Sequence, residues 1–274
     1  MNQFRPRVSF GSIPPVVKNL LIINVLVYVA MHAINSAFNY DISQNLALYF
    51  FKSEYFKPFQ FITHMFMHSS FSIGHIFFNM FALWMFGKAI ETMWGGKRFL
   101  IYYFVTGLGA AALHTLANWY SISIIENAAD LYYNSPSPEA FMSFLREHFP
   151  QVGINSEYIE SWSQIPSSSH YINDSSEFIQ KLIISKINVP TVGASGAVFG
   201  VLLAFGMLFP NTYLYVYFAI PVKAKYFVML YGPIELYAGV MNQPGDNIAH
   251  FAHLGGMIFG YFLIIYWKKK QFNK

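Results

Sequence analysis

The chain contains 274 residues, of which 55% are hydrophobic, 19% are aromatic and only 11% are charged. So little polar surface cannot cover a water-soluble globule, and the composition predicts a protein that crosses a lipid bilayer several times. The 17 basic residues outnumber the 13 acidic ones, but they lie beside apolar runs, so they indicate membrane topology and no nucleic-acid partner. Because the chain has no cysteine, disulfides and thiolate metal ligands are excluded.

The first half of the chain predicts three membrane-spanning helices. Residues 1–15 form a basic tail that ends in Pro14-Pro15, which breaks any helix before the first span. The first apolar run is long enough to cross a bilayer and lacks a clear cleavage site, so we interpret it as a retained anchor. Residues 38–74 are aromatic and interrupted by charges, which favours a segment that lies in the membrane interface. The three spans are expected at residues 16–37, 74–93 and 99–120.

The second half predicts a soluble insertion followed by three more spans. Residues 121–189 contain eight carboxylates and three basic residues, a composition that does not suit a span. A basic tail follows the last span over residues 268–274. The predicted fold class is an all-α membrane protein, a six-transmembrane-helix bundle over residues 16–270 with the soluble insertion between helices 3 and 4. The remaining spans are expected at residues 191–209, 222–240 and 247–267.

Basic residues fall on alternate connections between the predicted spans. By the positive-inside rule, these connections and both termini are expected to be cytoplasmic. The acidic insertion and the turn at residues 241–246 are then extracytoplasmic, and spans 2, 4 and 6 all run inward from the outer face. The residues that set this orientation are Arg5, Arg7, Lys18, Lys97, Arg98, Lys223, Lys225 and Lys268–Lys270.

Four polar side chains from three predicted spans share one depth in the membrane. His75 and Asn79 lie in span 2, Ser195 in span 4 and His253 in span 6, and a rise of about 1.5 Å per residue puts Asn79, Ser195 and His253 roughly 5 to 10 Å below the outer boundary. Polar groups in hydrocarbon usually face a bundle interior or a wet cavity, so a shared polar layer indicates a site. The alternative for Ser195 is helix packing, in which small residues allow close approach and the hydroxyl bonds to its own helix.

These residue types are sufficient for acyl transfer. Ser195 needs an adjacent base to become a nucleophile, and either His253 or His250 supplies an imidazole near it. His75 and Asn79, spaced i and i+4, can donate hydrogen bonds to a developing oxyanion, as can the backbone amide of Ser195.

The spans contain two carboxylates and no aspartate, which favours a Ser-His dyad over a triad. Glu91 is expected to accept hydrogen bonds from backbone amides or from the Lys97-Arg98 turn. For Glu235, a functional role, snorkelling to the interface and a protonated buried acid remain alternatives.

Small residues predict close packing of spans 4 and 6. Gly196-x-x-x-Gly200 and Gly256-x-x-x-Gly260 place glycines on one face of each helix, which lets two backbones approach closely enough for Ser195 to reach a histidine.

Three motifs in a fixed order carry a resemblance to a known family. They are Gly193-Ala194-Ser195-Gly196, the pair His75-x-x-x-Asn79, and the run from Ala252-His253 through Gly256 to Gly260. Together with six predicted spans over nearly all of residues 16–267, they resemble the rhomboid intramembrane serine proteases of the bacterial type.

The resemblance implies an endopeptidase that needs no cofactor or metal, with Ser195 as nucleophile and His253, rather than His250, as general base. His75 and Asn79 match the positions of oxyanion-stabilising side chains. It further implies single-span membrane proteins as substrates, cut near the outer face of a bacterial inner membrane. The residues expected to support the site are Gly193, Gly196, Phe199, His250, Gly256 and Gly260.

The resemblance also assigns regions and exposes departures. Residues 38–74 correspond to a partly submerged first loop, span 5 to a proposed substrate gate, and residues 241–246 to a cap over the active site. Many relatives have Trp-Arg in the first loop where this chain has Phe59-Gln60, and often a tyrosine where it has Phe199. The insertion exceeds the short connection usual in the family.

Two other functions remain as alternatives. A catalytically silent rhomboid-like protein would bind transmembrane segments without cutting them, although the intact Ser195 and His253 favour cleavage. A small transporter or channel would be expected to show repeated halves or a charged pathway, and the sequence has neither.

His64 and His68, spaced i and i+4, could hold a metal on one helix face, but without a neighbouring carboxylate we expect structural hydrogen bonds. The oligomeric state is not indicated.

Overall fold

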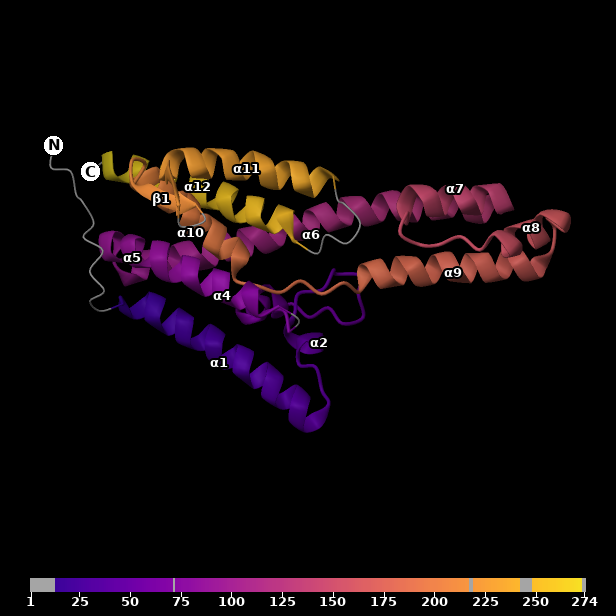
Figure 1. The fold of residues 1–274 in the computed structure, drawn as a ribbon, viewed down its shortest axis with the longest axis horizontal. Coiled ribbons are helices and arrows are strands. Elements are labelled where there is room, and N and C mark those ends of the chain that lie inside the picture. Colours follow the sequence, from indigo (N-terminus) through magenta and orange to yellow (C-terminus); the bar gives the residue numbers. More distant parts are fainter. Residues whose placement is uncertain (1–12, 71, 217–218, 242–247, 273–274) are drawn as a thin grey trace.

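The computed structural model describes residues 13–70, 72–216, 219–241 and 248–272. The fold is mostly helical, and its N-terminal half ends in one very long helix (Figure 1). The turn at residues 241–246, expected to cap the site, lies almost entirely outside the described residues. The elements of this half are α1 (Pro15–Phe38), α2 (Ser43–Leu46), α3 (Gln60–Thr63), the 3-10 helix η1 (His64–Phe66), α4 (Ile73–Ala82), the π-helical turn η2 (Leu83–Gly87), α5 (Lys88–Trp94) and α6 (Gly96–Asn134).

The C-terminal half adds three helices outside the main bundle, a short hairpin and three helices inside the bundle. The hairpin was not expected from the sequence. Its first strand contains two tyrosines and a valine, which favour strands, and exposed residues alternate there with half-buried ones. The two strands are antiparallel, and Tyr213 pairs with Lys223. The elements are α7 (Pro138–His148), α8 (Ser156–Gln164), α9 (Ser169–Ile187), α10 (Ser195–Leu208), β1 (Tyr213–Val216), β2 (Ile220–Lys223), α11 (Ala224–Met241) and α12 (His250–Phe272).

Four helical stretches in the described part of the chain are long and apolar enough to cross a membrane, which makes this an integral membrane protein. They agree with predicted spans 1, 2, 3 and 6, while predicted spans 4 and 5 correspond to α10 and α11. α10 is a shorter apolar helix, and it begins at Ser195, four residues later than expected. The four stretches are Pro15–Phe38, Ile73–Trp94, Gly96–Asn134 and His250–Lys270.

α10 is the central helix of the bundle. It packs against α6 and α12 over most of its length and against α11 and α4. Its residues are apolar in all directions, which is the pattern of a helix enclosed on every side, and Ala197, Val201 and Ala204 are fully buried. At the start of α10 its first residue, Ser195, is half-buried between the helices of the bundle.

α6 extends beyond the expected end of span 3. The third span was expected to end at residue 120, and the helix continues without a break to Asn134. The apolar residues of its C-terminal part, including Ile125 and Tyr132, form a second hydrophobic core with α7, α8 and α9, in which Trp162 is completely buried. Figure 1 shows these helices extending away from the main bundle.

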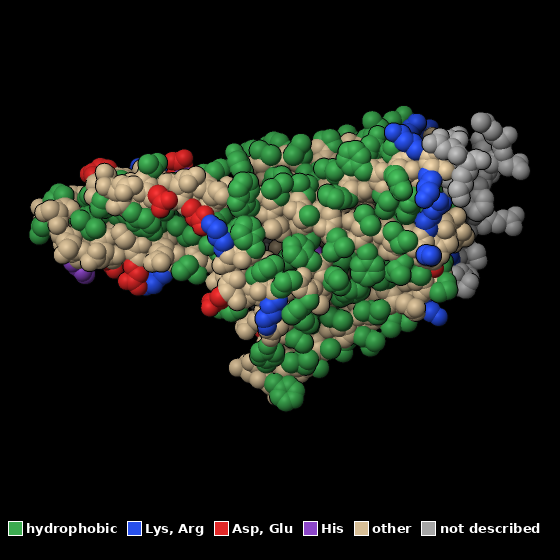
Figure 2. Space-filling view, turned by 180° about the vertical axis from the view of Figure 1, so that it is seen from behind, with side chains coloured by type: hydrophobic (Ala, Val, Ile, Leu, Met, Phe, Trp, Pro, Cys, Tyr) green, Lys and Arg blue, Asp and Glu red, His purple; other side chains and the backbone are tan. Residues whose placement is uncertain are grey.

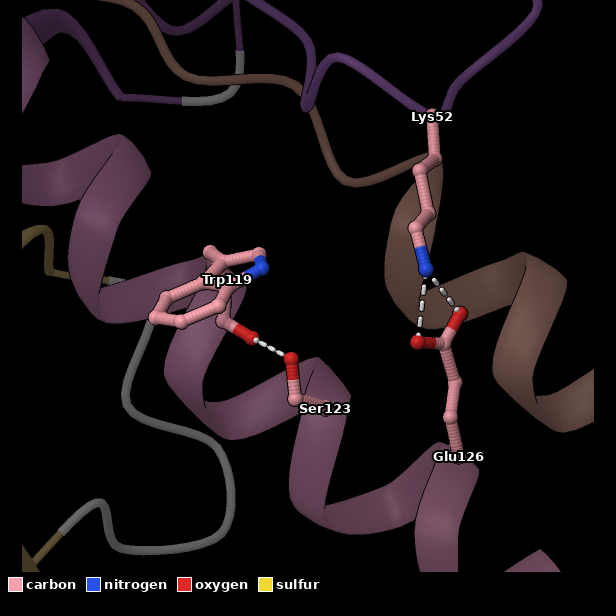
Figure 3. Close-up of polar contacts among 4 residues, drawn as sticks. All are labelled: Lys52, Trp119, Ser123 and Glu126. Carbon is pink, nitrogen blue, oxygen red and sulfur yellow. Dashed lines mark hydrogen bonds and ion pairs between the residues drawn. The ribbon is translucent and has the colours of Figure 1, made fainter. Parts of the chain in front are cut away.

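Two polar contacts attach this extension to the loop after α1. Lys52 donates hydrogen bonds to both carboxylate oxygens of Glu126 on α6, at 2.8 and 2.7 Å (Figure 3). Ser53 donates to the side-chain oxygen of Asn188, directly after α9, at 2.7 Å. The loop is therefore bonded to the extension where the chain enters it, at Glu126, and where the chain leaves it, at Asn188.

The two ends of the molecule differ in charge. Figure 2 shows Lys and Arg side chains gathered at the end of the bundle opposite the extension, and most Asp and Glu side chains on the extension. At the basic end Glu91, buried at 4% exposure, accepts from the backbone N–H groups of Val16 and Val17 at 3.0 and 2.7 Å. This confirms the backbone-amide alternative for Glu91, which caps the N-terminus of α1.

Candidate functional site

The loop before α10 is fixed by the first loop. Thr191 forms an antiparallel bridge with Leu48, and Gly193 donates its N–H to the carbonyl of His64 at 2.9 Å. The φ angle of Gly193 is +130°, a backbone conformation that a side chain would strain. The loop thereby presents Ser195 as the first residue of α10, where helix N–H groups have no partner within the helix.

His75 and Ser195 both lie beside Gly193. A Cβ built on Gly193 would lie 3.0 Å from Nε2 of His75 and 3.5 Å from Oγ of Ser195. The N–H of Ser69 donates to Nδ1 of His75 at 3.3 Å, so the ring proton of neutral His75 lies on Nε2. His75 therefore presents a hydrogen-bond donor on the side of the serine.

Asn79 lies one turn after His75 on α4 and is buried. Its Nδ2 donates to the carbonyl oxygen of His75 at 2.8 Å. Since a side-chain amide has two N–H donors, one of them is used within α4 and one remains for another acceptor.

His253 lies against the first turn of α10. Its ring is parallel to the ring of Phe199, with centroids 3.9 Å apart and planes 3° apart. Phe199 is four residues after Ser195 and so lies on the same helix face. The phenylalanine thus packs beside the histidine at the position where relatives often have tyrosine. Among the described residues no hydrogen bond joins Ser195 to His253, a contact that often tightens only when substrate binds.

Glu235, left unassigned by the sequence, contacts two histidines. Its Oε2 lies 2.9 Å from Nδ1 of His253 and 2.6 Å from Nδ1 of His250. Its exposure is 5%, so it does not snorkel to the interface. The pairing joins α11 to α12, and nothing in the local sequence of either helix indicates it.

The same three residues are a possible metal-binding group. Their candidate ligand atoms lie within 4.8 Å of one another, and two histidines with a glutamate are donors that suit Zn²⁺. The atoms bond to one another, so the cluster satisfies itself without an ion.

The glycines of the two G-x-x-x-G motifs make close contacts, but with two different helices. A Cβ on Gly256 would lie 1.8 Å from the carbonyl oxygen of Gly196, so α10 and α12 are in backbone contact as predicted. Gly200 and Gly260 instead face α6, where Cβ atoms would meet Thr106 and Tyr102 at 2.5 and 2.3 Å. The two motifs thus pack three helices together.

Gln60 anchors the first loop where relatives often have Trp-Arg. Its side chain is fully buried. The Oε1 atom accepts from the N–H groups of Tyr49 and Lys57 at 3.3 and 3.1 Å, and Nε2 donates to the carbonyls of Asn45 and Tyr55 at 3.0 and 2.8 Å. The departure at this position thus retains a complete set of hydrogen bonds within the first loop.

A small cavity lies behind Ser195. Its volume is about 10 Å³, roughly the space of one water molecule. Besides Ser195 and Gly193, its lining includes His64, His114 and Thr191. Nε2 of His114 bonds the hydroxyl of Thr191 at 3.0 Å, so a mostly apolar lining carries a few polar groups.

His64 and His68 should make stability depend on pH. Burial lowers the pKa of each to about 4 from an ordinary value of 6.5, and neighbouring His75 adds to the shift at His68. Between these values the unfolded chain binds protons that the folded protein does not, so stability should fall as pH decreases from about 6.5 to about 4. Thermal unfolding in detergent at a series of pH values measures this.

The variant His64→Gln should flatten that pH dependence, because it removes one of the two buried groups. The control His170→Gln replaces an exposed histidine and should leave the slope unchanged. Equal slopes in all three proteins would show that His64 is not the group that titrates on unfolding.

The fold and the site define an integral membrane protein with a serine, three histidines, an asparagine and a glutamate enclosed in a helical bundle. The Rhomboid domain model matches residues 55–124 and 169–270, and the chain belongs to the rhomboid family. The matched stretches contain Ser195, His253 and Glu235, and the gap between them contains α7 and α8.

A curated relative agrees with this assignment. The chain is 29% identical over 243 residues to RHOMBOID-like protein 12, mitochondrial, from Arabidopsis thaliana. The match covers 88% of this chain and 55% of the relative, so the chain spans about half the length of that protein.

Proposed function

We propose that this protein is an intramembrane serine endopeptidase that cuts single-span membrane proteins near the outer face of the membrane. The observation that supports it most is the placement of two imidazoles around the start of α10. His75 shares the space at Gly193 with the Ser195 hydroxyl, and His253 is stacked on Phe199 one turn after Ser195.

The chemistry follows from these positions. Ser195 Oγ attacks the scissile carbonyl carbon while His253 accepts the hydroxyl proton, and His253 then donates that proton to the leaving amine. The oxyanion that forms accepts hydrogen bonds from His75, from Asn79 and from the N–H of Ser195. Water, activated by His253, hydrolyses the acyl-enzyme and frees Ser195. The water-sized cavity beside Ser195 suits this last step.

The proposed topology has six spans with both termini in the cytoplasm. α10 and α11 cross with the four longer helical stretches, and the basic end of the bundle (Figure 2) is the cytoplasmic one by the positive-inside rule. The extension built on α6 is then an extracytoplasmic insertion. Ser195 lies at the end of α10 nearer the extension, which puts the reaction near the outer face.

The test is cleavage of a single-span reporter after reconstitution in liposomes. We expect the wild-type protein to cut the reporter within or beside its membrane segment, as mapped by mass spectrometry of the products, and Ser195→Ala to leave it intact. Cleavage that persists in Ser195→Ala would overturn the proposal. An intact reporter in both proteins, with the reporter still captured by the wild type, would support the silent rhomboid-like alternative.

A further inference from the structure

Glu235 points into the bundle from α11, whereas its two neighbours in the sequence face outward. The neighbouring residues Ile234 and Leu236 are 57% and 50% exposed, whereas Glu235 is 5% exposed. Burying a carboxylate is costly unless hydrogen bonds or charges compensate it. The compensation comes from α12, which supplies both His250 and His253.

When Glu235 is ionised, the two contacts define where the histidine protons lie. An ionised carboxylate only accepts hydrogen bonds, so Nδ1 of His250 and Nδ1 of His253 both act as donors to Oε2. A neutral histidine with its proton on Nδ1 has an unprotonated Nε2. His253 is thereby held in the tautomer whose Nε2 can accept a proton from a serine hydroxyl.

The orientation of the His253 ring is fixed as well. Phe199 stacks on its face, and Glu235 bonds its edge. A stacked ring can still turn in its own plane, and the bond to Glu235 removes that freedom. His250 holds the carboxylate with a second, shorter bond of 2.6 Å, so Oε2 is fixed from two sides.

We propose that Glu235 is a positioning residue that orients His253 and sets its tautomer, completing a Ser195-His253-Glu235 triad carried by three different helices. His250 fixes the carboxylate in this arrangement. The inference rests on the proposed function for its kinetic consequence, and it replaces the dyad expected from the sequence.

The kinetic test compares three variants in the reconstituted reporter assay. Glu235→Gln should lower kcat by about 100-fold or more, as loss of the acid does in other triads, with KM changed by less than about twofold because Glu235 is not expected to contact substrate. Glu235→Asp keeps the charge and should recover part of the loss. Glu177→Gln, which removes an exposed carboxylate on α9, should behave as the wild type.

The structural test does not depend on cleavage. Nitrogen-15 NMR of histidine-labelled protein in detergent should show His253 protonated at Nδ1 and unprotonated at Nε2, with the signal assigned by its loss in His253→Asn. In Glu235→Gln the signal should change to the other tautomer or to a mixture. An unchanged His253 tautomer would overturn the inference.

The two proposals fail in different ways. Cleavage that survives in Ser195→Ala overturns the protease assignment, and the NMR test of the tautomer still stands. Loss of cleavage in Ser195→Ala together with a normal kcat in Glu235→Gln overturns only the role of Glu235. If Glu235→Gln lowers the melting temperature strongly, its loss of kcat could come from unfolding, and Glu235→Asp becomes the deciding variant. A stable Glu235→Asp protein that recovers part of kcat supports positioning by the charge, and one that recovers none contradicts it.

Discussion

Replacing Ser195 with alanine should lower kcat/KM for a single-span reporter by about 1,000-fold or more. The hydroxyl oxygen forms the covalent bond in the proposed reaction, and alanine removes it without changing the helix. Ser195 lies at the first position of α10 and forms no hydrogen bond that the described structure records, so stability should change little. A melting curve in detergent and a progress curve in liposomes measure the two effects.

The companion variant His253→Ala should cost about as much as Ser195→Ala, and the double variant should cost little more than either. The losses of kcat/KM from two groups that act in the same step are not additive, because removing either group already prevents that step. Additive losses would mean that Ser195 and His253 do not act together.

The matched control for these variants is Ser123→Ala. Ser123 lies on α6, where its hydroxyl donates to the carbonyl of Trp119 at 2.7 Å (Figure 3). It is a serine with the ordinary role of bonding back to its own helix. We expect its variant to retain cleavage and labelling by a serine-reactive fluorophosphonate, whereas Ser195→Ala should lose both.

Replacing Gly256 with alanine should destabilise the protein by about 3 kcal/mol or more, at or above the upper range for overpacking. The new Cβ would lie 1.8 Å from the carbonyl oxygen of Gly196, and backbone atoms cannot rotate away as a side chain does. The strain can be relieved only by moving α12 away from α10, which carries His253 away from Ser195. Chemical unfolding in detergent and the reporter assay should therefore both detect the change.

Gly153→Ala is the control for that substitution, because no atom lies within 4 Å of the position of its Cβ. It should change the free energy of unfolding by less than about 0.5 kcal/mol, as surface substitutions usually do. A Gly256→Ala protein that is as stable and as active as Gly153→Ala would show that α10 and α12 are not in backbone contact.

The features that were predictable from the sequence are those with a local pattern. Runs of apolar residues gave the long helices, and the glycine spacing gave the contact of Gly196 with Gly256, because both signals depend on residues within a few turns of one helix. The placement of His75 and His253 beside the start of α10 agrees with the shared depth that was predicted. The roles assigned to these residues remain proposals.

What could not be predicted depends on how distant segments meet. The bond between Glu235 and His253 is set by the rotation of α11 relative to α12, which no periodicity encodes. Gln60 satisfies four backbone groups from different parts of a loop, and this set exists only after the loop has folded. That the helix of span 3 continues past residue 120 was also not predicted, because it depends on the second core, against which the apolar residues of this part of α6 pack.

The length of α6 has a mechanical consequence. Its 39 residues correspond to about 58 Å of helix, against roughly 30 Å of hydrocarbon in a bilayer. One uninterrupted rod thus passes from the distal helices, past the cavity behind Ser195, to the opposite end of the bundle. A molecule bound to the distal helices would therefore contact the same helix that packs against the start of α10, where a Cβ on Gly196 would lie 2.3 Å from the Cβ of Ala110.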